Sequence, residues 1–142
     1  MKRVSPREAK ALVDAGYTYV DVRSQEEFRA GHPEGAVNVP LLDVGPAGMA
    51  PNPEFLPVME GAFAKDAKLV VGCRSGGRSL RAAEMLVAAG FSEIVDQRAV
   101  YEGAPGQFGA RAEPGWAPSG LPVATGAPAG RTWADVKAKA GR

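Results

Sequence analysis

The sequence predicts an α/β fold in which helices cover a mostly parallel sheet. Segments rich in β-branched and aromatic residues alternate with amphipathic segments from residue 5 to residue 95. The chain has 142 residues, 45% of them apolar and 23% charged, which is the length and composition of one globular domain. We place this domain at residues 1–103, and we expect a Pro- and Gly-rich C-terminal extension at residues 104–142 to pack on it.

The first predicted element is a helix that begins after Ser5. Proline follows this serine, and Glu8 stands where a capping box needs its acidic residue. The helix should end near Gly16, because glycine commonly ends helices. Residues 17–22 follow with the sequence YTYVDV, which is rich in strand-forming residues and predicts a strand.

A second capping box predicts a short helix after this strand. Ser24 and Glu27 have the required spacing, and Gly31 should end the helix. Residues 36–39 are predicted to form a second short strand. Residues 40–52 contain several prolines and glycines and no periodicity, so we expect a surface loop there.

The next elements repeat the alternation of helix and strand. A helix is predicted to begin near Pro53 or Pro57 and to end around Lys65. The following elements are predicted as a strand at 69–71, a helix at 79–90 and a strand at 92–95. The buried face of the helix at 79–90 is expected to include Leu80, Ala83, Leu86 and Val87.

The composition changes after residue 103. Residues 104–130 have many prolines and glycines and few aliphatic side chains, which is typical of an extended segment on a surface. Trp116 is expected to anchor this segment on the core. Residues 132–137 are predicted to form a short terminal helix.

Charge and composition argue against several classes of function. The net charge of +1 argues against nucleic acid as a partner. No apolar run reaches the roughly 20 residues of a membrane span, and the N-terminus lacks a signal-peptide hydrophobic region, so we expect a cytoplasmic protein that does not bind membranes. With Cys73 as the only cysteine and His32 as the only histidine, the chain has no internal disulfide and no zinc cluster, and no cofactor is expected.

The loop that begins at Cys73 contains the candidate catalytic residue of the sequence. It lies between the predicted strand at 69–71 and the predicted helix at 79–90. A strand, a glycine-rich turn and a helix direct successive backbone N–H groups at one point, which here would be the Cys73 sulfur. Such groups favour the thiolate form of a cysteine, so we predict that Cys73 is a nucleophile and not a packed, inert residue.

The rest of the loop is predicted to bind an anion beside Cys73. Arg74 and Arg78 are cations near a helix start, where they oppose the helix dipole unless an anion is bound. Ser79 is expected to cap the helix and to donate to the thiolate. The complete predicted binding set is Arg74, Ser75, Gly76, Gly77, Arg78 and Ser79.

Two motifs of this chain resemble those of single-domain rhodanese-like sulfurtransferases. Residues 73–79, CRSGGRS, resemble the active-site loop of that family, and residues 20–28, VDVRSQEEF, with residues 31–40, GHPEGAVNVP, resemble its N-terminal signature. The resemblance covers roughly residues 4–103. It implies a rhodanese-like fold, with a five-stranded parallel sheet flanked by helices.

The resemblance also implies a reaction. Cys73 would take a sulfane sulfur from a small anionic donor and pass it, as a persulfide, to cyanide or to a small-molecule or protein thiol, for instance a thioredoxin-like one. The ring from Cys73 to Arg78 is one residue shorter than in the cysteine-based phosphatases of similar fold, which favours sulfur transfer over phosphatase activity. The two arginines of the loop favour the dianion thiosulfate over mercaptopyruvate as donor.

Three alternatives remain open from the sequence. The protein could be a persulfide carrier or relay that turns over thiosulfate poorly, or a rhodanese-like interaction module without turnover. Phosphatase or arsenate-reducing activity is disfavoured by the ring size and by the absence of a resolving cysteine. Residues 96–103 depart from the family pattern, because many members have a Gly-Gly pair after the last core strand.

Other polar residues are predicted to have structural roles. His32 follows the predicted helix end, where an imidazole often bonds the last carbonyls. Asp21 and Arg23 lie at a strand end and are expected to form a buried pair or a cap. Glu26 and Glu27 are interpreted as first-turn helix charges.

Overall fold

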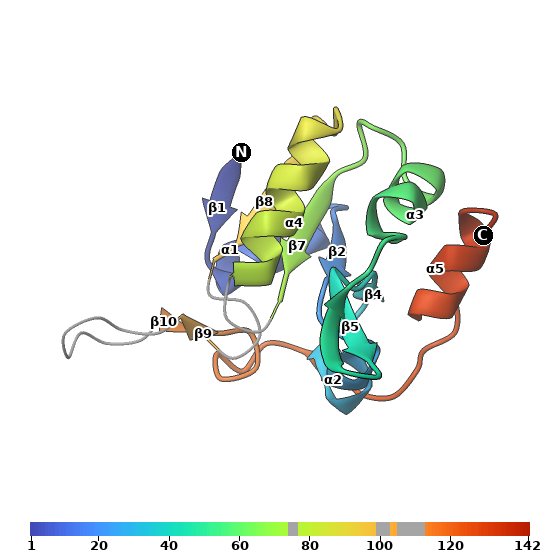
Figure 1. Ribbon diagram of the computed structural model, residues 1–142. Helices are drawn as coiled ribbons and strands as arrows, with labels where there is room; N and C mark the ends of the chain where they lie inside the picture. Colours follow the sequence, from blue (N-terminus) through green and yellow to red (C-terminus); the bar gives the residue numbers. More distant parts are fainter. Residues whose placement is uncertain (74–76, 99–102, 105–112) are drawn as a thin grey trace.

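The computed structural model describes residues 1–73, 77–98, 103–104 and 113–142 (Figure 1). A central sheet of five parallel strands runs in the order β1-β8-β7-β2-β4. Its strands are β1 (Lys2–Val4), β2 (Thr18–Asp21), β4 (Val37–Asn38), β7 (Leu69–Gly72) and β8 (Ile94–Gln97). The described helices are α1 (Pro6–Asp14), α2 (Gln25–Ala30), α3 (Phe55–Ala62), α4 (Gly77–Ala88) and α5 (Trp133–Lys139). The predicted α/β fold with a five-stranded parallel sheet is confirmed.

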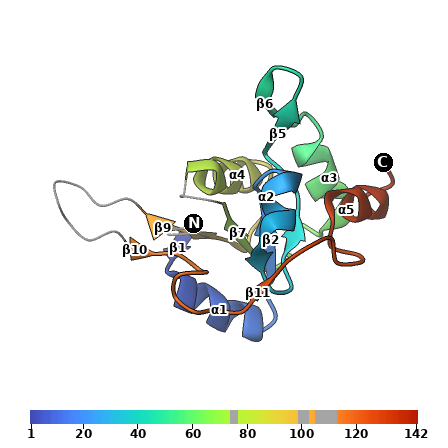
Figure 2. The same ribbon diagram turned by 90° about the horizontal axis from the view of Figure 1, so that it is seen from below.

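The helices cover the sheet on both faces, and each face has its own apolar cluster (Figures 1 and 2). Successive strand residues point to opposite faces. Val20 and Val71 therefore pack with α3, α4 and α5, whereas Tyr19 and Val70 pack with α1 and α2. Both faces of the central strands are buried, as expected for a parallel sheet.

The predicted capping boxes at the starts of α1 and α2 are confirmed. Ser5 accepts a hydrogen bond from the backbone N–H of Glu8, and Ser24 accepts one from that of Glu27. In both cases the glutamate side chain bonds back to the backbone of the serine, so each capping box is complete. These contacts satisfy N–H groups that have no partner inside a helix, which is why the short helices begin where the sequence predicts.

The N-terminal strand β1 was not predicted. It is three residues long and pairs with β8 at the edge of the sheet, with Lys2 opposite Val95. Three residues carry no periodicity that a sequence pattern can reveal, so only the pairing with β8 makes them a strand.

The predicted loop at residues 40–52 contains a hairpin instead. Strands β5 (Leu42–Gly45) and β6 (Gly48–Pro51) pair in antiparallel fashion around a turn at Pro46 and Ala47. Gly48 has a φ of 104°, which residues with a Cβ rarely adopt. The expectation of a surface position holds for residues 46–50, which are exposed, but the expectation of a loop was wrong for residues 42–45 and 48–51, which form strands.

Helix α4 begins two residues before the predicted start, and its predicted buried face was partly wrong. Ala83 and Leu86 are buried as expected, but Val87 is 44% exposed. Ser79 and Ala82 are buried in place of Val87 and Leu80. The small side chains of Ser79 and Ala82 allow the first turns of α4 to pack closely on the sheet. A prediction of the buried face from hydrophobicity alone favours larger apolar residues and misses these two positions.

Residues 113–142 contact both faces of the sheet. Trp116 is 1% exposed, and its ring meets that of Tyr19 edge-on with the centroids 5.4 Å apart. Further along, β11 (Val123–Ala124) pairs with β3 (His32–Pro33), and α5 packs against α3. The predicted anchoring by Trp116 and the predicted terminal helix are therefore confirmed, while the domain boundary at Gly103 stays a prediction.

Two short strands, β9 (Gly103–Ala104) and β10 (Glu113–Pro114), pair with each other in antiparallel fashion.

Among the helices of the described segments, none has the length and apolar character needed to cross a membrane.

Candidate functional site

The candidate site lies at the carboxyl end of β7. Cys73 directly follows this strand, which lies between β8 and β2 in the sheet (Figure 1). Open α/β sheets bind their ligands at this end of the strands. The Cys73 residue is only 2% exposed and belongs to the apolar cluster beneath α3 and α4.

The first turn of α4 contacts the Cys73 sulfur. The backbone N–H of Ser79 donates a hydrogen bond to Sγ at a distance of 3.2 Å, and Ser79 itself is fully buried. The N-terminal turn of a helix has partly positive, unsatisfied N–H groups, so it stabilises negative charge on a nearby atom. The predicted capping role of Ser79 was wrong, because α4 begins two residues earlier at Gly77. Ser79 does donate to the sulfur as predicted, but through its backbone amide.

Three of the predicted binding residues, Arg74, Ser75 and Gly76, lie outside the described residues. Gly77 begins α4, and a Cβ atom added to it would meet nothing within 4 Å. The described structure therefore gives no steric reason for glycine at position 77.

The structure requires glycine at position 72, which the sequence did not predict. A Cβ atom on Gly72 would lie 1.9 Å from the hydroxyl oxygen of Tyr19. That ring is buried and packs against Trp116, so it cannot move aside easily. Burial raises the pKa of Tyr19 well above its ordinary value, which keeps the hydroxyl neutral. Glycine is needed directly before Cys73 because of this neighbour, which only the pairing of β2 with β7 brings there.

Arg78 is held by Glu27, a residue for which the sequence suggested only a helix-end role. The two terminal nitrogens of Arg78 donate to the two carboxylate oxygens of Glu27 at 2.7 and 3.0 Å. Paired, parallel bonds of this kind fix the orientation of a guanidinium. Glu27 thus joins α2 to the start of α4, in addition to completing the capping box of α2.

The pKa values of this pair agree with its geometry. Partial burial by itself would raise the pKa of Glu27, but the bonds and the charge of Arg78 outweigh it and lower the pKa to about 2. The bonds to Glu27 raise the pKa of Arg78, and the coulombic interaction with Cys73 contributes in the same direction. Arg78 is therefore charged, oriented and electrostatically coupled to Cys73.

Replacing Glu27 with glutamine should remove a pH-dependent part of the stability. The folded-state pKa of about 2 is below the ordinary value of 4.5, so the pair stabilises the folded state in full above pH 4.5 and loses that contribution as the pH falls toward 2. We expect Glu27→Gln to be less stable than the wild type at neutral pH, with the difference shrinking to near zero at the acid end. Urea unfolding across this pH range measures the difference.

Glu26→Gln is the matched control for this prediction. Glu26 is exposed in the same first turn of α2, so its replacement changes the helix charge without touching Arg78. An equal, pH-dependent loss in both variants would show that the effect comes from the helix dipole and not from the pair.

A second ion pair, between Asp21 and Arg23, is fully buried at the end of β2. Asp21 and Arg23 are 1% and 4% exposed, and the shortest bond between them is 2.7 Å long. Arg23 also donates to the backbone carbonyl of Gly31. Burial by itself would lower the pKa of Arg23, but its bonds to Asp21 raise it, so the guanidinium stays charged. The predicted structural pair is confirmed.

This pair adjoins the strand end that carries Cys73. Asp21 lies opposite Gly72 in the register of β2 and β7, and the N–H of Val22 donates to the carbonyl of Gly72. Asn38 bonds the backbone carbonyls of both Asp21 and Arg23. The end of β7 is thus fixed by neighbours on β2 whose own positions are set by hydrogen bonds.

His32 has the predicted structural role. Its ring is buried and stacks on Phe28 with the centroids 3.7 Å apart, and Nδ1 bonds the carbonyl oxygen of Phe28 at 2.6 Å. Burial lowers the pKa of His32, which favours the neutral ring with the proton on Nδ1. Within the described residues, no group of three or more His, Cys, Asp or Glu side chains is placed to hold a metal ion.

The comparisons with known proteins point to one family. The family model described as "Rhodanese-like domain" matches residues 5–103 of this chain. Thiosulfate sulfurtransferase 16, a chloroplastic protein of Arabidopsis thaliana, is 40% identical over 120 residues, which cover 84% of this chain and 90% of that protein.

Two further relatives extend this result. The senescence-associated protein DIN1 of Raphanus sativus is 43% identical over 93 residues, and the match spans about half of its length, 51%, and 66% of this chain. The crystal structure of Rv0390 from M. tuberculosis superposes with a TM-score of 0.72 at 25% identity, covering 89% of this chain and 98% of that one. Sequence and structure comparisons therefore agree.

Proposed function

The chain belongs to the family of rhodanese-like domains, and on that basis we propose that it is a sulfurtransferase that moves a sulfane sulfur from thiosulfate to a thiophilic acceptor. The sulfur is carried as a persulfide on Cys73. The acceptor is cyanide or a thiol.

The hydrogen bond from the Ser79 amide to the Cys73 sulfur is the observation that carries this proposal. A thiolate is a far better nucleophile than a thiol, and N–H groups of a helix N-terminus stabilise it. The same amide can stabilise the negative charge of a persulfide, because the charge stays close to the first turn of α4. A cysteine that was only packed in the core would not need this donor.

The positive charge beside Cys73 supports an anionic donor. Arg78 is oriented by Glu27 and is electrostatically coupled to the thiol. We assign to Arg78, together with Arg74 and the amides of residues 75–77, the binding of the sulfonate group of thiosulfate. Glu27 takes the edge of the Arg78 guanidinium formed by its two terminal nitrogens, so Arg78 would meet the anion with its positive charge and its remaining N–H groups.

Both steps of the proposed reaction, the loading of Cys73 and the transfer to the acceptor, are nucleophilic substitutions at sulfur. In the first, the Cys73 thiolate attacks the outer sulfur of thiosulfate, a new S–S bond forms, and sulfite leaves with the electron pair of the broken S–S bond. In the second, cyanide attacks the terminal sulfur of the persulfide, thiocyanate forms, and the Cys73 thiolate returns. Dividing the transfer between two covalent steps is the advantage of a nucleophilic catalyst.

The test is the mass of the intact protein. The reduced protein is incubated with thiosulfate, weighed by mass spectrometry, treated with cyanide and weighed again. We expect the mass to rise by one sulfur atom, the added sulfur to map to the peptide that contains Cys73, and cyanide to remove it as thiocyanate. The Cys73→Ser protein is the control and should gain nothing.

The alternatives give different results in the same experiment. A protein that gains no sulfur from thiosulfate but gains one from a persulfidated protein would be a relay. A protein that gains sulfur from neither would be an interaction module without turnover, and the proposal would be wrong.

A further inference from the structure

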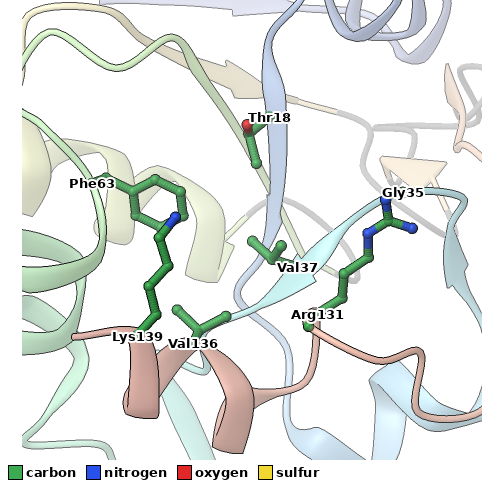
Figure 3. Close-up of a pocket in the computed structure, with 8 residues that line it drawn as sticks. Thr18, Gly35, Val37, Phe63, Arg131, Val136 and Lys139 are labelled. Carbon is green, nitrogen blue, oxygen red and sulfur yellow. The ribbon is translucent and has the colours of Figure 1, made fainter. Parts of the chain in front are cut away.

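A cavity lies at the end of the sheet opposite Cys73. It has a volume of about 260 Å³ and opens at the amino ends of β2 and β4, between the end of α3 and helix α5 (Figure 3). Thr18, which lines it, pairs with Leu69 at the start of β7, whereas Cys73 follows the last residue of β7. Four strand residues span roughly 13 Å, so this cavity is separate from the candidate site.

The cavity is lined by both apolar and polar groups, and its rim is positively charged. Val37, Phe63 and Val136 supply the apolar side chains. Arg131 and Lys139 extend along opposite sides of the opening, with Val37 and Val136 between them (Figure 3). No acidic residue is among the described residues that line the cavity.

Within the described residues, Arg131 and Lys139 have no carboxylate partner, unlike several other cations of the chain. Arg3, Lys65, Arg78 and Lys137 each form an ion pair with an acidic side chain. Among the described residues, neither Arg131 nor Lys139 has one within 4.0 Å. Asp135, which is close in sequence, accepts instead from the backbone N–H of Gly130.

Both cations are attached to fixed parts of the structure. The carbonyl of Arg131 accepts a hydrogen bond from the N–H of Asn38 on β4, at 2.9 Å. The ammonium group of Lys139 lies 5.2 Å from the centre of the Phe63 ring, within the range of a cation–π contact. The backbone of Arg131 and the ammonium group of Lys139 therefore have defined neighbours, and the two exposed side chains flank the cavity.

We propose that this cavity binds a small organic anion with an apolar body and carboxylate groups. The apolar body would rest on Val37, Val136 and Phe63, and the carboxylates would meet Arg131 and Lys139. The volume is slightly below the usual range of ligand pockets, so the ligand has the size of a small metabolite. A purely inorganic anion would leave the apolar side chains of Val37, Phe63 and Val136 in contact with water.

Binding would also join two parts of the chain. Arg131, Val136 and Lys139 belong to the C-terminal segment, whereas Val37 is on β4 and Phe63 ends α3. A ligand that contacts both parts stabilises the folded state in which α5 is docked, by mass action. The melting temperature should therefore rise with ligand concentration.

The test uses three probes that share one aromatic ring and differ in charge. Isophthalate carries two carboxylates, benzoate one, and benzamide none on the same ring. Each is titrated into the full-length protein, with the backbone amides of Thr18 and Val37 followed by NMR and the melting temperature measured in parallel. We expect the affinity to fall in the order isophthalate, benzoate, benzamide, with shifts at both amides.

Charge-removing variants complete the test. Arg131→Gln and Lys139→Gln should each weaken isophthalate binding by about fivefold to tenfold. Arg81→Gln is the matched control, because Arg81 is an exposed cation on α4 outside the cavity, and it should change nothing. Amide spectra of each variant without probe show whether it is folded.

Three results would overturn the inference: equal binding of benzamide and isophthalate, equal loss of binding in Arg81→Gln, or no shift at Thr18 and Val37 with millimolar isophthalate. None of them depends on Cys73, so sulfur loading can succeed or fail independently.

Discussion

Replacing Asp21 with asparagine should lower the free energy of unfolding by about 3–5 kcal/mol, the cost of leaving one member of a buried ion pair without its partner. Asp21 is 1% exposed and receives bonds from both the backbone and the guanidinium of Arg23. Asparagine keeps the shape but loses the charge, so the guanidinium of Arg23 would remain buried without a counter-ion. Urea unfolding followed by circular dichroism measures the loss.

Asp14→Asn is the control for this variant. Asp14 also pairs with a cation, Lys10, but its side chain is 62% exposed. Such surface pairs contribute only about 0.3–0.5 kcal/mol. A double variant, Asp21→Leu with Arg23→Met, should recover much of the stability, because it removes both charges together. If Asp21→Asn cost no more than Asp14→Asn, the buried pair would not be needed for the fold.

Replacing Trp116 with alanine should cost a similar amount, about 3–5 kcal/mol. The side chain is fully buried between the sheet and the C-terminal segment, it contacts Tyr19, and its Nε1–H donates to the carbonyl of Pro122 at 2.7 Å. Alanine would leave a cavity beside Tyr19, whose hydroxyl lies against Gly72. Chemical denaturation measures the lost stability, and near-ultraviolet circular dichroism reports the packing of the aromatic rings.

Trp133→Ala is the matched control, since Trp133 is in the same segment but only partly buried on the other face. It should cost clearly less than Trp116→Ala. Trp116→Phe should cost about 1 kcal/mol beyond its change in size, because it also loses the bond to Pro122. Equal losses for the two alanine variants would contradict a specific anchoring role for Trp116.

Much of the fold could be predicted because its signals are local. The capping boxes at Ser5 and Ser24 and the apolar run at 69–71 need only neighbouring residues to act. The same holds for the candidate nucleophile, since Cys73 directly follows the strand β7 and the helix α4 begins at Gly77.

The errors concern interactions between distant segments. β1 is a strand because it pairs with β8 at the edge of the sheet. Val87 is exposed because α4 packs on β7 and β8 through its other face, which holds Ala82, Ala83 and Leu86. The pair of Arg78 with Glu27 joins residues 51 positions apart, and no spacing rule connects them. The capping box of α2 explains Glu27 from its local sequence, so the sequence gives no reason to expect its second contact, the ion pair with Arg78.

The sequence by itself determined the alternation of the central strands β2, β4, β7 and β8 with the helices, the starts of α1 and α2 at their capping boxes, and the position of Cys73 at the end of a buried strand next to a helix. These features depend on backbone propensities and hydrogen bonds within a few residues. Only the tertiary structure decided that Glu27 holds Arg78, that Tyr19 requires glycine at position 72, and that Arg131 and Lys139 flank one cavity. The physical reason is that these contacts depend on sheet order and helix packing, which bring together side chains whose separation in the sequence carries no signal.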